Sequence, residues 1–234
     1  MFPALLAALT ILSPADTTKH IFFTGDAGII NASGNTEFTS ISAGDKLTLL
    51  HHGWKFTQTF GVTYAKAHDS ITTEQWQGSV RGDRSLTPHV GLFLLTELGR
   101  NVFAGVRSRV SPSFGVTAIA AEGPRDTLRL EAGGGYTWQH GIPPDTNRAY
   151  AAGRAAAIYR HRLGPKAAFD QLFEYYPNFS VGADFRINSE SAISAPITTG
   201  IALKAAYIVH FEGLPSPGFK KTDRILTTGV QVTF

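Results

Sequence analysis

From about residue 22 to its end, the chain alternates apolar and polar residues with a period of two. In the segment 55–65, Phe56 and Phe60 fall on one face of an extended chain, and Thr57 and Thr59 fall on the other. Successive side chains of a β-strand point to opposite faces, whereas a helix would scatter these residues around its circumference. The segment is therefore predicted to be a strand with one apolar and one polar face.

The same test, applied between turn signals, predicts twelve strands. Two of them, 150–162 and 166–176, are also compatible with helices on propensity alone, so ten strands is the alternative. The expected strands cover residues 22–32, 37–50, 55–65, 72–84, 89–98, 103–120, 127–139, 150–162, 166–176, 179–193, 197–211 and 222–234.

The composition of the two faces selects the class of all-β fold. One face of most strands is Val, Leu, Phe, Tyr, Trp, Ala and Gly, and the other holds Thr, Ser, Gln and isolated charges. Only 17% of the residues are charged, against about 25% in soluble domains. Long alternating strands separated by turns are typical of an antiparallel transmembrane β-barrel, whose closure leaves no unpaired backbone edge in hydrocarbon.

Other classes are excluded by simple counts. The longest apolar stretch, residues 2–12, is shorter than the roughly 20 residues of a spanning helix. The chain has no cysteine, which excludes disulfides and thiolate sites. Its net charge of +3, without a basic run, argues against a nucleic-acid partner.

Two regions are expected along the chain. Residues 1–18 are predicted to be a signal peptide or a disordered N-terminus, because an apolar run ends at Ser13-Pro14-Ala15, although no Lys or Arg precedes it. Residues 19–234 are predicted to form a single barrel domain. The location that follows is the bacterial outer membrane.

The lengths of the expected connections separate two rims. Tight turns are expected on one rim at 51–54, 85–88, 123–126, 163–165 and 194–196, and longer loops on the other at 66–71, 140–149 and 212–221. Short periplasmic turns and longer outer loops are the usual asymmetry of outer-membrane barrels.

The last strand ends in Phe234, with Val230 and Val232 at alternate positions before it. This pattern is similar to the C-terminal signal that outer-membrane barrels present to their assembly machinery. We therefore expect barrel-assembly machinery and outer-membrane lipids as partners, and a monomer.

Three stretches carry a resemblance to a known family. They are Ser33-Gly34-Asn35-Thr36, Leu130-Glu131-Ala132-Gly133-Gly134-Gly135-Tyr136, and Leu214-Pro215-Ser216-Pro217 leading through Lys220-Lys221-Thr222-Asp223 into the last strand. Over about residues 22–234 the chain resembles a bacterial family of salt-induced outer-membrane proteins whose function is unknown. The resemblance implies a monomeric outer-membrane barrel and no established activity.

The charges on the polar face are the candidate functional residues, because that face would line the lumen. They are Lys46, Arg81, Asp83, Glu97, Arg107, Arg109, Arg129, Glu131, Asp184, Arg186, Glu190 and Lys204. Neighbours of opposite sign at alternate positions (Arg81/Asp83, Arg129/Glu131, Asp184/Arg186) predict paired packing that fills the barrel. A diagonal pairing of Glu97 with Arg107, and of Asp184 with Lys204, is also expected.

The sequence carries no Gly-x-Ser-x-Gly or His-Glu-x-x-His motif, so no catalytic, cofactor-binding or metal site is predicted. His210 together with Ser191 or Asp223 could resemble the catalytic residues of an outer-membrane lipid hydrolase, but their spacing matches no motif. The expected function is that of an envelope protein or a narrow pore for small solutes or ions. A surface receptor or adhesin, and less so a lipid hydrolase at the rim, are the alternatives.

Overall fold

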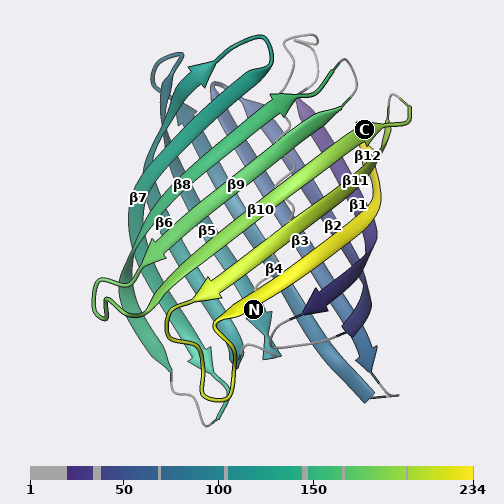
Figure 1. Ribbon diagram of the computed structural model, residues 1–234. Helices are drawn as coiled ribbons and strands as arrows, with labels where there is room; N and C mark the ends of the chain where they lie inside the picture. The colour runs from purple at the N-terminus through teal and green to yellow at the C-terminus, as the bar shows by residue number, and fades with distance from the viewer. Residues whose placement is uncertain are drawn as a thin grey trace.

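A computed structural model describes residues 20–33, 38–67, 70–102, 105–143, 147–164, 167–198 and 200–233. Within these ranges the chain forms twelve strands and the turns between them (Figure 1). No helix among the described residues is long and apolar enough to cross a membrane. The predicted signal segment 1–18, the hairpin at Gly34-Asn35 and Phe234 lie outside the described residues.

The strand boundaries lie close to those predicted. They are β1 (Ile21–Ser33), β2 (Phe38–His51), β3 (Trp54–Ala67), β4 (Ser70–Ser85), β5 (Val90–Asn101), β6 (Val106–Glu122), β7 (Asp126–Gly141), β8 (Arg148–Arg162), β9 (Ala168–Pro177), β10 (Phe185–Pro196), β11 (Ile201–Glu212) and β12 (Thr222–Thr233).

Each strand pairs antiparallel with its neighbours in sequence, and β1 pairs with β12, so the sheet closes into a barrel. The closing register runs from Thr24 opposite Thr233 to Ser33 opposite Arg224. The segments that could have been helices are strands β8 and β9, which pair with each other. The prediction of an all-β, twelve-stranded antiparallel barrel is therefore confirmed.

The two faces of the sheet separate apolar from polar residues as the alternation predicts. On the outer surface, Leu94 is 60% exposed and Phe114 is 67% exposed. On the inner surface, Thr57 and Thr59 are buried. Among the described residues, more polar than apolar side chains are buried, and apolar ones such as Phe93 and Ile208 pack between them.

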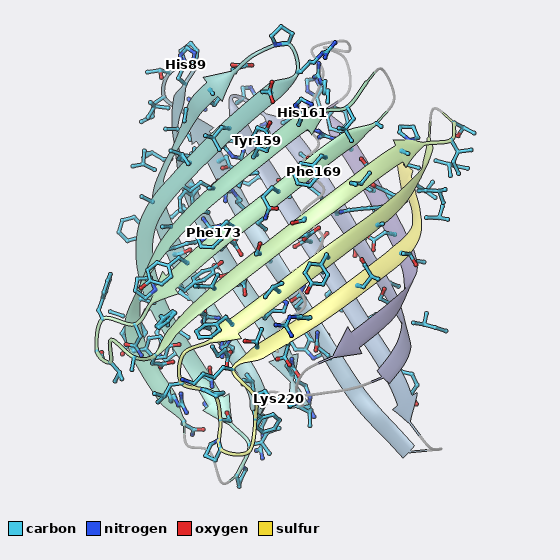
Figure 2. All side chains as sticks on the ribbon, viewed as in Figure 1. His89, Tyr159, His161, Phe169, Phe173 and Lys220 are labelled. Carbon is cyan, nitrogen blue, oxygen red and sulfur yellow. The ribbon has the colours of Figure 1, made fainter. Side chains whose placement is uncertain are left out.

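The turns predicted to be tight and the loops predicted to be longer lie at opposite ends of the barrel. His89 and His161 lie at the rim of the short turns, and Lys220 lies at the opposite rim (Figure 2). The expected loop 66–71 is wrong in extent, because β3 continues to Ala67 and β4 starts at Ser70. The two strands keep pairing there across a register shift.

The predicted strand 179–193 also needs correction, because β10 starts at Phe185. The side chain of Asn178 causes the difference: its Oδ1 accepts hydrogen bonds from the backbone N–H of Ser180 (2.8 Å) and of Val181 (3.2 Å). An asparagine that caps its own following backbone makes a turn that competes with strand pairing. Residues 178–184 are therefore a loop on the rim of the longer loops.

Candidate functional site

The inward side chains enclose a cavity of about 200 Å³, which is the candidate functional site. Strands β2 to β10 contribute to its lining, so it lies within the barrel rather than on its surface. Its charged lining residues are Lys46, Lys55, Arg81, Asp83, Glu97, Arg109, Arg129, Arg154, Glu174 and Arg186. Seven of these ten are cations.

The centre of the site is a cluster of ion pairs around Glu131, whose side chain is 0% exposed. Glu131 accepts hydrogen bonds from Arg81 (2.8 and 3.0 Å) and from Arg154 (2.5 Å), and its Oε1 lies 3.4 Å from Nε of Arg129. These four residues come from β4, β7 and β8. One carboxylate is thus shared by three guanidinium groups.

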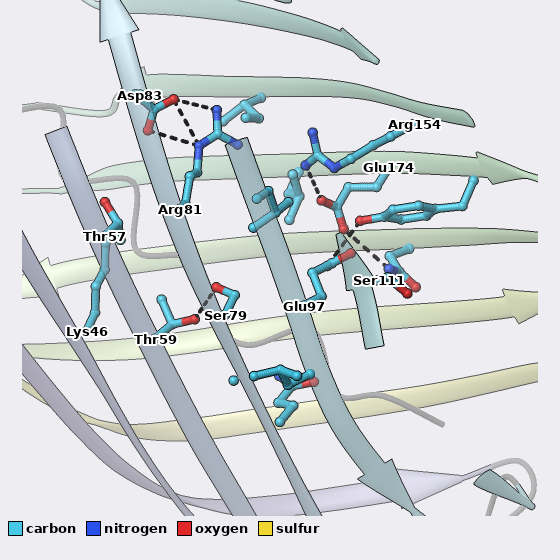
Figure 3. Close-up of a pocket in the computed structure, with 18 of the residues that line it drawn as sticks. Lys46, Thr57, Thr59, Ser79, Arg81, Asp83, Glu97, Ser111, Arg154 and Glu174 are labelled. Atoms are coloured by element: carbon cyan, nitrogen blue, oxygen red, sulfur yellow. Dashed lines mark hydrogen bonds and ion pairs between the residues drawn. The ribbon is translucent and has the colours of Figure 1, made fainter. Parts of the chain in front are cut away.

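Two further carboxylates complete this cluster. Arg81 donates to both oxygens of Asp83, at 2.7 to 3.0 Å, and Arg154 donates to Glu174 at 2.7 Å (Figure 3). We call the six residues the arginine cluster: Arg81, Asp83, Arg129, Glu131, Arg154 and Glu174. Its three positive and three negative charges balance, which reduces the cost of holding them in a low-dielectric interior.

Aromatic side chains support the arginine cluster from β5 and β9. The guanidinium carbons of Arg81 and Arg154 lie 4.7 and 5.4 Å from the ring centroid of the buried Phe93. The ring centroid of Tyr176 lies 5.9 Å from the guanidinium carbon of Arg154 and 4.8 Å from that of Arg186. The Tyr176 hydroxyl donates a hydrogen bond to Glu97 (3.3 Å). A cation over the face of an aromatic ring is stabilised electrostatically without the need for an acidic partner.

At the rim of the longer loops, residues 213–221 lie over the mouth of the barrel. A Cβ atom on Gly105, which precedes β6, would lie 2.7 Å from Oγ of Ser216 in this loop. The connections β5–β6 and β11–β12 belong to opposite sides of the barrel, so this contact spans its mouth. Below it, Arg109 donates to Glu212 at 3.3 Å, again between β6 and β11.

A second group of charges lies deeper between β8 and β11. Lys204 is 3.4 Å from Glu190, and Arg160 is 3.4 Å from Asp170. These are ion pairs between neighbouring strands rather than contacts across the lumen.

The structure places most of the predicted lumen residues inside the barrel. Lys46, Arg81, Asp83, Glu97, Arg109, Arg129 and Arg186 line the cavity, while Glu131, Glu190 and Lys204 form buried ion pairs beside it. Of the three predicted neighbour pairs, Arg81/Asp83 and Arg129/Glu131 are formed.

Two of the predicted residues lie elsewhere. Arg107 lies at a register shift that turns Val106 inward, and it is exposed, so it does not meet Glu97. Asp184 belongs to the loop 178–184, where it accepts a hydrogen bond from Asn178 (2.9 Å) and lies 3.8 Å from Arg148. It therefore pairs with neither Arg186 nor Lys204.

Lys55, Arg154, Glu174 and Tyr176 are site residues that the sequence analysis missed. Lys55 shares the inward face of β3 with Thr57 and Thr59, so the alternation alone identifies it. Arg154 lies on β8 and the other two on β9, the strands whose type was ambiguous. Once those segments are taken as strands, the same parity places all three residues inward.

No cluster of metal-ligating side chains occurs among the described residues. The structure does not bring His210 and Ser191 together as a hydrolase would require. His210 is buried, with Nδ1 2.8 Å from Oδ1 of Asn188. Ser191 lies on the outer face of β10, where its hydroxyl donates to Gln171. Asp223 is opposite His210 in the β11–β12 register.

The chain is similar in sequence to a protein family and to a curated bacterial protein. The model of a family described as "Protein of unknown function, DUF481" matches residues 25–234. A curated relative, "Uncharacterized protein YdiY" of Escherichia coli (strain K12), is 26% identical over 235 residues, which cover 97% of this chain and 91% of that protein.

Solved structures of similar shape are bacterial barrels. The NanC porin has a TM-score of 0.61 at 13% identity, with 89% of this chain and 98% of that chain covered. The translocator domain of the autotransporter NalP from Neisseria meningitidis has a TM-score of 0.59 at 11% identity, covering 94% and 90%. The KdgM porin in complex with disordered oligogalacturonate has a TM-score of 0.52 at 10% identity, covering 91% and 99%. At these identities the likeness shows the fold.

Proposed function

The chain belongs to the DUF481 family of proteins of unknown function, and from that premise we propose that it is a narrow pore of the bacterial outer membrane that favours small anions. The observation that carries the proposal is the internal cavity, whose charged lining is seven cations and three carboxylates. Solutes that enter a confined space respond to the charges that face it, so this lining would attract anions and repel cations.

The outer surface supports a membrane location. Large apolar side chains such as Phe60, Val62 and Leu130 are more than 40% exposed, and they follow one another around the barrel. Water-soluble proteins rarely expose an apolar surface this extensive. Lipids of the outer membrane would cover this belt, and Trp54 and Tyr136 stand where interfacial aromatic girdles are found.

Assembly and oligomeric state belong to the same proposal. Val230 on β12 faces outward and is 44% exposed, as a C-terminal assembly signal with Val232 and Phe234 would require. We propose that barrel-assembly machinery recognises this strand and that the chain works as a monomer, because the barrel closes on itself without a second chain.

The arginine cluster and the loop 213–221 limit what could pass. The cluster joins side chains of β4, β7, β8 and β9, and the loop covers part of one mouth. Ions and small solutes are the expected cargo. A barrel that these two features close completely would serve envelope integrity instead, and this is the second candidate function.

Single-channel recording of refolded protein in planar bilayers separates these two functions. We expect small, discrete conductance steps, and a reversal potential in a potassium chloride gradient that indicates preference for chloride. The heat-unfolded protein serves as the control for bilayer leakage. Cation preference would overturn the anion proposal, and silence at all voltages would favour the closed barrel.

A further inference from the structure

A buried hydroxyl on the inner wall of β3 has no partner. Thr57 is 9% exposed, it lines the cavity, and its Oγ1 makes no hydrogen bond with any described residue. By contrast, Oγ1 of Thr59, two residues further along the same face, is 2.6 Å from Oγ of Ser79. Buried polar groups are nearly always satisfied, so an unpartnered one on a cavity-lining residue is a candidate ligand position.

The strand register surrounds this hydroxyl with cationic residues. Lys55 precedes Thr57 by two residues on the same face of β3. Lys46 is opposite Thr59 on β2 and is therefore a diagonal neighbour of Thr57. On the other side Thr57 is opposite Arg81 on β4. Figure 3 shows Lys46, Thr57 and Thr59 together on this wall, away from Arg154 and Glu174.

An acidic residue on the neighbouring strand β4 is already engaged. Asp83 is opposite Lys55 in the β3–β4 register, but Arg81 donates three hydrogen bonds to its carboxylate. Among the charged groups that act on Lys46 are Lys55 and Arg129, both of which line the same cavity. Positive charge therefore accumulates around Thr57, while the carboxylates gather in the arginine cluster.

We propose that Thr57, Lys46 and Lys55 form a binding subsite for a small oxyanion with more than one negative charge, of the phosphate or sulfate type. The proposal deepens the proposed anion pore and rests on it for access of the ligand. A tetrahedral oxyanion offers several acceptor oxygens, so one can accept from the Thr57 hydroxyl while others meet the two ammonium groups. Chloride offers a single charge, and a carboxylate offers two oxygens with one charge.

The test measures binding of inorganic phosphate to the refolded full chain by titration calorimetry in detergent, at constant ionic strength. Sulfate, acetate and chloride are the comparison ligands. The variants are Lys55→Met, Lys46→Met and Thr57→Val, which remove the charges or the hydroxyl at similar side-chain size. Thr117→Val is the matched control, because its Oγ1 is also buried and without a hydrogen-bond partner among the described residues, but Thr117 is not among the cavity-lining residues.

We expect phosphate and sulfate to bind more tightly than acetate and chloride. Each Lys→Met change should weaken phosphate binding roughly tenfold and Thr57→Val by roughly three- to tenfold, whereas Thr117→Val should leave it unchanged. Equal binding in Thr57→Val and Thr117→Val, or no preference for phosphate over acetate, would overturn the subsite. If the chain binds phosphate but conducts no ions, the pore proposal is overturned and the subsite proposal holds. If it conducts ions but binds no phosphate, the subsite proposal is overturned and the pore proposal holds.

Discussion

Two walls of the same lumen use charge in opposite ways. On the wall built from β4, β7, β8 and β9, every guanidinium of the arginine cluster lies against a carboxylate, and Glu131 serves three of them. On the wall built from β2 and β3, Lys46 and Lys55 flank a hydroxyl that has no hydrogen-bond partner among the described residues.

We infer from this difference that the first wall serves mainly stability and the second wall mainly ion binding. Matched charges that are largely buried hold strands together across the lumen, and the removal of one member leaves the others uncompensated. The lysines of the second wall line the cavity that a solute would enter. We therefore expect changes on the first wall to affect mainly stability, and changes on the second wall to affect mainly ion preference.

The largest expected effect is that of Glu131→Gln. Three arginines lose the charge that they share, and the free energy of unfolding should fall by about 3–5 kcal/mol, as when a buried ion pair is broken. Urea titrations of refolding into lipid vesicles measure it. Glu122→Gln at the exposed end of β6 is the control and should change little. Since Arg81 and Arg154 also depend on Glu131, the added change Arg129→Ala should not restore stability.

A smaller loss is expected for Gly133→Ala on the same wall. A Cβ atom there would lie 2.3 Å from the backbone oxygen of Phe114, so β6 and β7 would have to move apart, at a cost of roughly 1–3 kcal/mol. The adjacent Gly134 has 3.5 Å to the oxygen of Ala152, and Gly134→Ala should be close to neutral. Equal losses in vesicle refolding would mean that these strands do not approach so closely.

The smallest effect on stability is expected for Lys55→Met on the second wall. Asp83 stays bound to Arg81, no group is left unpaired, and the free energy of unfolding should change by no more than about 1 kcal/mol. The same variant should reduce the preference for anions in bilayer recordings. A loss of stability as large as that of Glu131→Gln would show that the two walls do not differ.

Much of this organisation could be predicted from the sequence, and the failures are local. The parity of Thr57 and Thr59 against Phe56 and Phe60 gave the inside and outside of β3 correctly. The alternation gave the wrong side for Arg107, because a β-bulge there inserts one extra residue. Val106 therefore points into the barrel in place of Arg107. The alternation also failed at Asp184, because the Asn178 side chain ends the strand pairing of that segment.

The sequence by itself determined the strands, their two faces and the closed barrel, because alternation is a local property and closure follows from the need to pair every edge. Only the tertiary structure decided which charges meet. Arg81 and Glu131 are separated by 50 residues, and Arg109 and Glu212 by 103. Whether such side chains pair depends on the register and tilt that bring distant strands to the same height in the lumen, and on how far each side chain reaches across it. Those distances arise only when the barrel closes.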